Sequence, residues 1–268
     1  CGANTIDLSS LGSIGESANI HDNYDTEVID MSALTSIGGS FTINNNVDLE
    51  ELNIASLESV DGGIQVNSNS SLASFAVPNL TLVEGSINFN SNSGIEDIVF
   101  ESLTTIEGDF RFNYNHYVER VSMPALTELQ GQLYIYNNER LESLIFSSLS
   151  EISSSIEIQY NYQLEIVDFT SLQVVNGSVQ LYYMNQVDEL SLPSLEEVNG
   201  SLNISNNSAM DFLYAPALYD LSGSLTIRDN TDLAGVDLSS LECIEDFTVV
   251  GNNMTPEVLH CLLYTSPS

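Results

Sequence analysis

The chain repeats itself every 23 residues, and this period limits its possible folds more than any other feature of the sequence. A leucine recurs at every step from Leu11 to Leu241, which gives eleven coils if each repeat is one turn of a solenoid. We call this leucine column 1 and number the other positions of the repeat from it. One coil cannot bury its apolar face alone, so neighbouring coils must stack. The sequence predicts one repeat domain over residues 1–253, in an unbroken register without insertions.

Apolar and polar residues alternate in two short stretches of each repeat. Columns 8 and 10 form one apolar pair, such as Phe41 and Ile43, and columns 19 and 21 form another, such as Leu52 and Ile54. Alternation is the period of a β-strand, and no repeat has room for a long helix. The predicted fold is therefore an all-β, single-domain β-solenoid, a right-handed β-helix of about eleven coils. We expect columns 1, 4, 8, 10, 13, 16, 19 and 21 to face inward.

Two polar columns point to the corners between strands. Column 6 is usually glycine, as at Gly62, and a corner there needs either a positive φ or a close approach of two backbones. Column 13 is asparagine in every coil except at Met184, and Asn253 holds it in the last coil. A stacked asparagine can bond backbone groups that no strand reaches. We therefore expect a buried asparagine ladder.

The repeat L-x-x-I-x-G-S-φ-x-I-x-N-N-x-x-L, in which φ is apolar, resembles the receptor L-domain, a relative of the leucine-rich repeats. The resemblance covers about Ile6 to Asn253. Similar repeats occur in fungal GPI-anchored cell-wall proteins and in bacterial surface proteins. The resemblance implies an extracellular or cell-surface protein that binds a ligand. The regular coils and the absence of extra disulfides set this chain apart from the receptor L-domains.

The charge balance limits the partners of the protein. There are 4 basic and 38 acidic residues, a net charge of −34, so the chain has no basic footprint for nucleic acid or anionic lipid. No apolar run is long enough to cross a membrane, so we expect no direct membrane insertion, although lipid or GPI anchoring is compatible with the sequence. The expected partner is a glycan, a protein or a second copy of the chain.

Column 17 repeats a carboxylate along the rod. Neighbouring carboxylates about 5 Å apart repel by roughly 0.8 kcal/mol in water. The column can be a solvated edge suited to a salty medium, or it can bind Ca²⁺ weakly between coils. The candidate cation ladder is Glu96, Glu119, Glu142, Glu165 and Asp188.

We find no conventional catalytic grouping and predict that the protein is not an enzyme. His21, His116 and His260 lie in different coils, and the sequence contains neither a phosphate-binding glycine loop nor a G-x-S-x-G elbow. We expect no cofactor other than possible Ca²⁺.

Tyrosines gather on four successive coils, and this is the main departure from the repeat. We expect columns 9, 11 and 12 to be the outward positions of the main strand. Eight of the 12 tyrosines lie in these columns, or at the positions just beyond, between Leu103 and Met184. Tyrosine suits any exposed strand, because cross-strand pairs stabilise a sheet. It also supplies rigid, amphipathic contact area and concentrates in binding surfaces. The predicted ligand-contact residues are Arg111, Tyr114, Tyr134, Tyr136, Glu157, Tyr160, Tyr182 and Tyr183.

The C-terminal residues 254–268 break the repeat. Thr255 suits a helix N-cap and Pro256 suits a first turn, which predicts a short capping helix followed by a disordered tail. We expect Cys243 and Cys261 to form a disulfide that holds this cap, and two buried thiols are the alternative. Cys1 can be disulfide-bonded, lipidated or free.

Candidate glycosylation sites are Asn79, Asn176, Asn199, Asn203 and Asn206. The asparagines of the sequons at Asn69 and Asn253 belong to the expected buried ladder, so we predict that they are unmodified.

The favoured function is a binding or adhesion module. The alternative is a structural building block of a cell wall, extracellular matrix or filament. Ice binding is a lesser alternative, because the threonines of column 2 form only a short, broken array.

Overall fold

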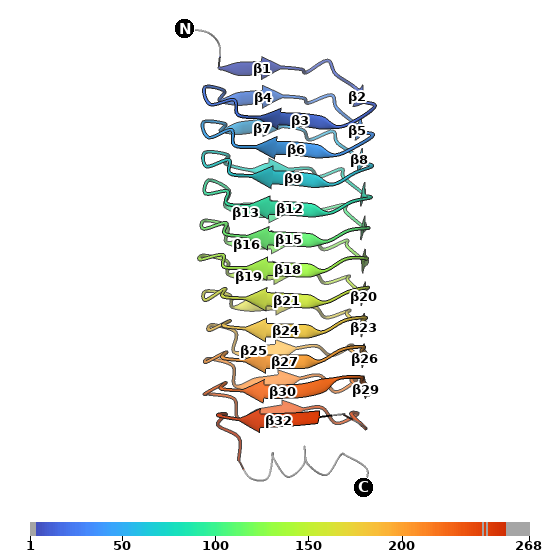
Figure 1. Ribbon diagram of the computed structural model, residues 1–268, viewed down its shortest axis with the longest axis vertical. Coiled ribbons are helices and arrows are strands. Elements are labelled where there is room, and N and C mark those ends of the chain that lie inside the picture. The colour runs from blue at the N-terminus through green and yellow to red at the C-terminus, as the bar shows by residue number, and fades with distance from the viewer. Residues whose placement is uncertain (1–3, 243, 245, 256–268) are drawn as a thin grey trace.

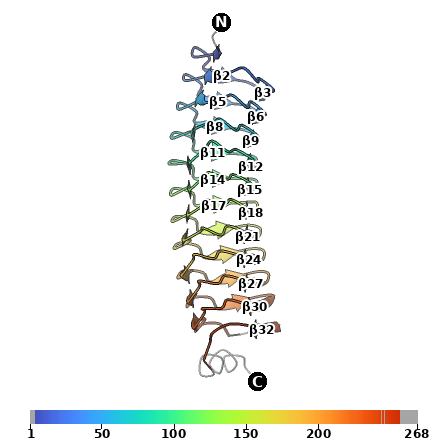
Figure 2. The ribbon, with the colours of Figure 1, turned by 90° about the vertical axis from the view of Figure 1, so that its left-hand side faces the viewer.

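The computed structural model describes residues 4–242, 244 and 246–255 of the protein. Within these residues all regular structure is β-strand, and the strands of successive coils pair in parallel along a straight rod (Figure 1). The predicted all-β solenoid of about eleven coils is confirmed. Figure 2, turned by 90°, shows the coils stacked in even steps.

Each typical coil contributes one strand to each of three faces. The front sheet takes columns 8–11 and holds eleven strands. They are β3 (Ala18–His21), β6 (Phe41–Asn44), β9 (Ile64–Asn67), β12 (Ile87–Asn90), β15 (Phe110–Asn113), β18 (Leu133–Tyr136), β21 (Ile156–Gln159), β24 (Val179–Tyr182), β27 (Leu202–Ser205), β30 (Ser224–Arg228) and β32 (Asp246–Val250).

A narrow second sheet, made from columns 3 and 4, holds ten two-residue strands. They are β2 (Ser13–Ile14), β5 (Ser36–Ile37), β8 (Ser59–Val60), β11 (Leu82–Val83), β14 (Thr105–Ile106), β17 (Glu128–Leu129), β20 (Glu151–Ile152), β23 (Val174–Val175), β26 (Glu197–Val198) and β29 (Asp220–Leu221).

The third face is interrupted twice and forms three short sheets. The first contains β1 (Thr5–Asp7), β4 (Val28–Asp30) and β7 (Glu51–Asn53). The second contains β10 (Phe75–Ala76), β13 (Asp97–Val99), β16 (Arg120–Ser122), β19 (Ser143–Ile145) and β22 (Ile166–Asp168). The third contains β25 (Glu189–Ser191), β28 (Phe212–Tyr214) and β31 (Gly235–Asp237).

A single apolar core runs through the middle of the rod. Most residues of the inward columns predicted from the sequence are buried, with Leu103, Ile106 and Phe112 at 0% exposure, whereas Val167 and Val236 are half-buried and Leu8 in the first coil is exposed. Ile135 pairs with Phe112 on one side and Ile158 on the other, so each apolar rung rests on two others. This stacking supplies the burial that one coil lacks.

The asparagine ladder is confirmed, and its bonds explain the column. The backbone N–H of Asn69 donates to Oδ1 of Asn92 at 3.1 Å, and Nδ2 of Asn69 donates to the carbonyl of Ile43 at 2.8 Å. Asn69 itself is 0% exposed. The amide of each rung therefore accepts the backbone N–H at the corner of the preceding coil and donates to a carbonyl of the preceding front-sheet strand.

The glycine column reflects close backbone packing rather than positive φ. A Cβ placed on Gly62 would lie 2.7 Å from the carbonyl carbon of Gly39 and 2.7 Å from the nitrogen of Ser40. Among the glycines of the described residues, positive φ is found at Gly251. Column 6 therefore keeps glycine because the preceding coil leaves no room for a side chain.

The expected unbroken register is wrong in the last coil. There Ser224 pairs with Asp246 and Ile227 pairs with Val249, an offset one residue shorter than elsewhere. Asn252 then accepts the ladder bond from the backbone N–H of Asn230 at 3.0 Å. Asn253 is exposed, so the prediction that it is buried in the ladder was wrong. The register follows the inward-facing Phe247 and Val249 because a one-residue slip would turn both outward.

The predicted C-terminal features lie mostly outside the described residues. Cys1, Cys243, Cys261 and residues 256–268 belong to this group, so the capping helix and the disulfide stay predictions. Within the described part of the chain, no helix has the length and apolar character needed to span a bilayer.

Candidate ligand-contact surface

Six tyrosine rings form a continuous cluster at the end of the front-sheet strands. We call Tyr114, Tyr134, Tyr136, Tyr160, Tyr162 and Tyr183 the tyrosine cluster. Tyr136 is central, with its ring centroid 5.5 Å from that of Tyr114, 5.9 Å from Tyr134 and 5.4 Å from Tyr160. Tyr160 continues the chain of contacts to Tyr183 at 4.8 Å and to Tyr162 at 6.3 Å. Coil stacking thus joins residues that are far apart in sequence.

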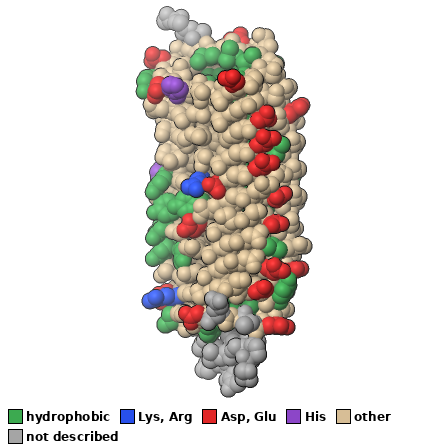
Figure 3. Space-filling model, turned by 45° about the vertical axis from the view of Figure 1, so that its right-hand side comes forward, with side chains coloured by type: hydrophobic (Ala, Val, Ile, Leu, Met, Phe, Trp, Pro, Cys, Tyr) green, Lys and Arg blue, Asp and Glu red, His purple; other side chains and the backbone are tan. Residues whose placement is uncertain are grey.

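The cluster is partly exposed to solvent. Figure 3 shows hydrophobic side chains, a class that includes tyrosine, gathered along one margin of this side of the rod, while acidic side chains line the other. Tyr114 is 41% exposed and Tyr162 is 40% exposed. The other four members are half-buried against their neighbours. The arrangement offers several aromatic rings, in fixed positions, to a partner.

Column 12 lies in the corner rather than on the strand, which corrects the expectation that it is an outward strand position. Strands β15, β18, β21 and β24 end at column 11. The next residue has a positive φ in ten successive coils, including 56° at Tyr114, 57° at Tyr160 and 56° at Tyr183. Asparagine and aspartate tolerate this region, whereas a bulky side chain there is an outlier. Three tyrosines therefore occupy backbone positions that disfavour them. Residues in such strained conformations are often found at functional sites.

The carboxylate of Glu157, a predicted contact residue, is bonded by two glutamine side chains of the front sheet. Glu157 Oε2 accepts a bond from Nε2 of Gln132 at 3.0 Å, and its Oε1 accepts one from Nε2 of Gln159 at 3.0 Å. Burial, and after it the negative charge of Glu157, raises the pKa of both Tyr134 and Tyr182. Glu157 thus holds this part of the surface in place while its own acceptors are engaged.

Arg111 is likewise engaged within its own coil. Its Nε and Nη2 donate to Oδ2 of Asp109 at 3.1 and 2.9 Å. Arg111 pairs in register with Tyr134 of the next coil, so the ion pair borders the tyrosine cluster. Nearby, the guanidinium carbon of Arg140 lies 4.6 Å from the ring centroid of Tyr117, a cation–π contact.

The structure therefore brings the predicted contact residues together on adjoining coils. Tyr114, Tyr134, Tyr136, Tyr160 and Tyr183 belong to one ring network, while Tyr182 lies beside it and is half-buried. Tyr162 is a member of the network that the sequence-based selection omitted. The sequence signal for Tyr162 was its position just past the strand end, beside the other tyrosines of the four coils.

The acidic ladder of column 17 is exposed along its length. Backbone bonds stack these residues, as in Glu119 N–H to Glu96 carbonyl at 2.8 Å and Glu142 N–H to Glu119 carbonyl at 2.8 Å. In the described residues, no group of three or more histidine, cysteine, aspartate or glutamate side chains is placed to hold a metal ion. Calcium binding along Glu96, Glu119, Glu142, Glu165 and Asp188 stays a prediction.

The candidate glycosylation sites differ in accessibility. Asn79, Asn176 and Asn199 are exposed, whereas Asn203 and Asn206 are half-buried. Asn199 Nδ2 donates to Oδ1 of Asn176 at 3.0 Å, so these two side chains also form a short ladder. Modification at any of the five stays a prediction.

The threonines considered for ice binding have a structural use. The hydroxyl of Thr104 donates to the carbonyl of Thr81 at 3.0 Å, and the hydroxyl of Thr127 donates to the carbonyl of Thr104 at 3.2 Å. These hydroxyls tie consecutive coils together at the corner after column 1.

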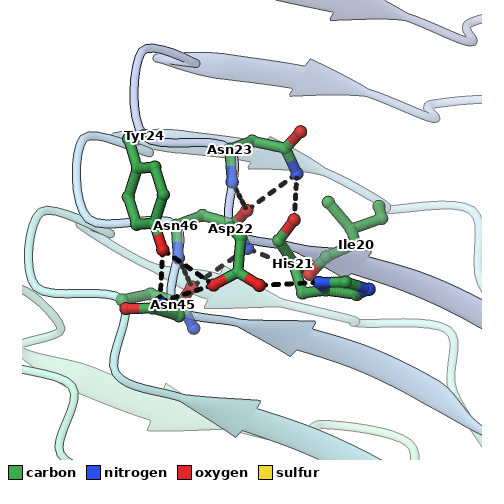
Figure 4. Close-up of polar contacts among 8 residues, drawn as sticks. Ile20, His21, Asp22, Asn23, Tyr24, Asn45 and Asn46 are labelled. Atoms are coloured by element: carbon green, nitrogen blue, oxygen red, sulfur yellow. Dashed lines mark hydrogen bonds and ion pairs between the residues drawn. The ribbon is translucent and has the colours of Figure 1, made fainter.

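A polar cluster in the first coils was missed by the sequence analysis. Figure 4 shows the Asp22 carboxylate accepting bonds from His21 Nδ1 at 3.0 Å, Asn45 Nδ2 at 2.5 Å and Tyr24 Oη at 3.0 Å. These bonds, the one from His21 first, lower the pKa of Asp22. Asp22 is a column 12 residue with a φ of 59°, so the cluster secures the first positive-φ corner.

Comparison with known proteins gives one distant structural likeness. The chain is similar to a leucine-rich repeat protein from Bacteroides ovatus ATCC 8483, with 17% sequence identity and a TM-score of 0.34 over 91% of this chain and 74% of that one. No family model and no curated protein matches the chain. From its own geometry, the chain is a parallel β-solenoid with an exposed tyrosine cluster.

Proposed function

We propose that the protein is an extracellular or cell-surface binding module, without enzymatic activity, whose tyrosine cluster contacts a glycan or a protein. The observation that carries the proposal is the continuous ring network from Tyr114 to Tyr183. The buried apolar columns of those coils are the same as elsewhere, so packing of the core does not call for the cluster. Its rings combine apolar faces with hydroxyl groups, which suits both sugar rings and protein side chains.

The backbone conformation of column 12 supports the same proposal. Tyrosine replaces the asparagine, aspartate or serine of other coils at three positive-φ positions, where the strain is of order 1–3 kcal/mol for a residue that disfavours this region. Such strain persists where function retains it. The charge of −34 fits a protein that stays soluble and separate from other acidic surfaces. The resemblance to receptor L-domains favours ligand recognition at the outer face of a solenoid.

The experiment is a binding screen with two double variants. Wild-type protein is applied to glycan and extracellular-protein arrays, and its oligomeric state is measured by sedimentation. The test variant is Tyr136→Ser/Tyr160→Ser, which removes two rings at the centre of the cluster. The matched control is Tyr24→Ser/Tyr219→Ser, which removes two exposed rings elsewhere.

The proposal predicts a monomer that binds at least one arrayed molecule. Binding should weaken by more than about 1 kcal/mol in the test variant and stay unchanged in the control. A structural building block would instead form end-to-end or lateral polymers. Polymers without a ligand, or equal binding by both variants, would contradict the proposal.

A further inference from the structure

A hollow in the front sheet lies directly beside the tyrosine cluster. It measures about 310 Å³, within the usual range for ligand sites, and crosses the three neighbouring strands β9, β12 and β15. Its lining is Gln65, Asn67, Asn88, Phe89, Asn90, Arg111 and Asn113. The next strand, β18, carries Tyr134 opposite Arg111 and Tyr136 opposite Asn113. The hollow and the aromatic rings therefore form one continuous strip along the rod.

The polar groups of the hollow are largely uncommitted. Among the described residues, the side chains of Gln65, Asn67 and Asn88 make no hydrogen bond to another protein group. Oδ1 of Asn113 has no partner either but is buried, so the amides open to the surface are those of Gln65, Asn67 and Asn88. This contrasts with the same columns farther along the rod, where Gln159 donates to Glu157 and the hydroxyl of Ser205 donates to Asn203. The amides of the hollow are thus free to bond a ligand without breaking a bond within the protein.

The chemistry of this lining selects the class of ligand. Primary amides both donate and accept, as sugar hydroxyls do. The charge of Arg111 is offset by Asp109 at 2.9 Å, so the hollow has no free positive charge for an anionic polymer. The surrounding protein is strongly acidic and would repel one. The one apolar lining residue, Phe89, is 1% exposed, so the hollow offers no pocket for an apolar peptide side chain.

We propose that this hollow is a subsite for an uncharged oligosaccharide, which lies along the rod with its hydroxyl groups on the amides of β9 and β12 and a sugar ring against Tyr134 and Tyr136. This inference rests on the proposed function and names its ligand. Strands about 4.8 Å apart give a strip of roughly 14 Å from β9 to β18, which requires a chain of several sugars rather than a monosaccharide. The amides then fix hydroxyl positions, and the aromatic rings supply the apolar contact.

The test is isothermal titration with short, purified neutral oligosaccharides derived from cellulose, xylan, mannan and chitin, and with oligogalacturonide as the acidic counterpart. The hollow variant is Asn67→Ala/Asn88→Ala, and the isosteric variant Asn67→Asp/Asn88→Asp keeps shape while removing amide donors. Tyr136→Ser/Tyr160→Ser reports on the rings, and Tyr24→Ser/Tyr219→Ser is the control. Circular dichroism melts show which variants retain the fold.

The expected result is binding of a neutral oligosaccharide by wild type, with at least a tenfold weaker affinity in the hollow, isosteric and ring variants and no change in the control. Binding that depends on the rings but is unaffected in both hollow variants would overturn the subsite and leave the proposed function standing. Preference for oligogalacturonide would also overturn the subsite. Failure of wild type to bind any neutral oligosaccharide would overturn it too, while a protein ligand found on the arrays would still uphold the proposed function.

Discussion

The ring of Tyr160 stacks on the ring of Tyr183 with 4.8 Å between centroids and 13° between planes, and both residues have a positive φ. The stack joins two consecutive corners of the solenoid. It contributes about 0.5–1.5 kcal/mol beyond burial, which offsets part of the cost of placing tyrosine in the left-handed region. Backbone strain and the proposed contact surface thus coincide at Tyr160 and Tyr183.

This relationship predicts the order of stability of two variants of Tyr183. Tyr183→Asn and Tyr183→Ala both remove the ring, but asparagine accepts a φ of 56° more readily than alanine does. We expect the asparagine variant to unfold with a free energy about 1 kcal/mol higher than that of the alanine variant, measured by urea denaturation. An alanine variant as stable as the asparagine variant would show that the corner carries no such strain.

The asparagine ladder predicts a large cost at one rung and a small cost at another. Asn115 accepts the backbone N–H of Asn92 at 3.1 Å and donates to the carbonyl of Phe89 at 3.2 Å. Asn115→Leu leaves the Asn92 N–H unpaired in the core and removes the bond to the Phe89 carbonyl, which costs roughly 2–5 kcal/mol. In the same column, Met184→Leu changes no such bond and should cost less than about 1.5 kcal/mol. Similar losses in thermal unfolding for the two variants would contradict the structural role of the ladder.

The glycine column predicts opposite signs for two identical substitutions. At Gly62 a Cβ would lie 2.7 Å from Gly39 and Ser40 of the preceding coil, so Gly62→Ala should destabilise by about 1–3 kcal/mol. At Gly12 nothing lies within 4 Å of the added atom, so Gly12→Ala should stabilise by about 0.4–1 kcal/mol through the unfolded chain. Calorimetric melts of both variants check the signs, and a neutral Gly62→Ala would argue against close packing of the corners.

An alkaline titration tests the contact between Tyr219 and Glu197. The hydroxyl donates to Oε1 of Glu197 at 2.5 Å, and this bond is the main reason why the pKa of Tyr219 is raised to about 12. The folded pKa exceeds the ordinary value of about 10, so the contribution of this bond to stability is present below pH 10 and is lost as the pH rises through about 12.

The difference in phenolate absorbance between wild type and Tyr219→Phe isolates this step. We expect it near pH 12, and we expect Glu197→Gln to move it toward pH 10. A step near pH 10 in wild type would show that the bond is not kept in solution.

The buried columns could be predicted well from the sequence because every coil repeats the same pattern of apolar residues. Leu103, Ile106 and Phe112 are buried as their columns require, and a repeated pattern allows one reading to be checked against ten others. The last coil was predicted wrongly because its spacing from the preceding coil is one residue shorter than the 23-residue period. The apolar alternation of Phe247 and Val249, followed by Asn252, carried the correct register.

The tyrosines of the candidate site could be predicted from the sequence, but their backbone conformation and the hollow beside them could not. The tyrosines were visible as a departure from the repeat, and coil stacking brings them together as expected. Their backbone conformation was not deduced, although Asp22 and Asn45 in the same column are residue types that favour positive φ. The hollow beside Asn67 and Asn88 depends on side-chain arrangement across three strands, which periodicity does not specify.

The most direct measurement of the central claim is hydroxyl-radical footprinting, with and without the oligosaccharide or protein found in the screen, read out by mass spectrometry. Four tyrosines of similar exposure serve as reporters: Tyr114 at 41% and Tyr162 at 40% in the cluster, and Tyr24 at 52% and Tyr219 at 45% outside it. If the cluster is the contact surface, binding will lower oxidation of Tyr114 and Tyr162 and leave Tyr24 and Tyr219 unchanged. Protection of Tyr24 or Tyr219 while Tyr114 and Tyr162 react as before would contradict the account.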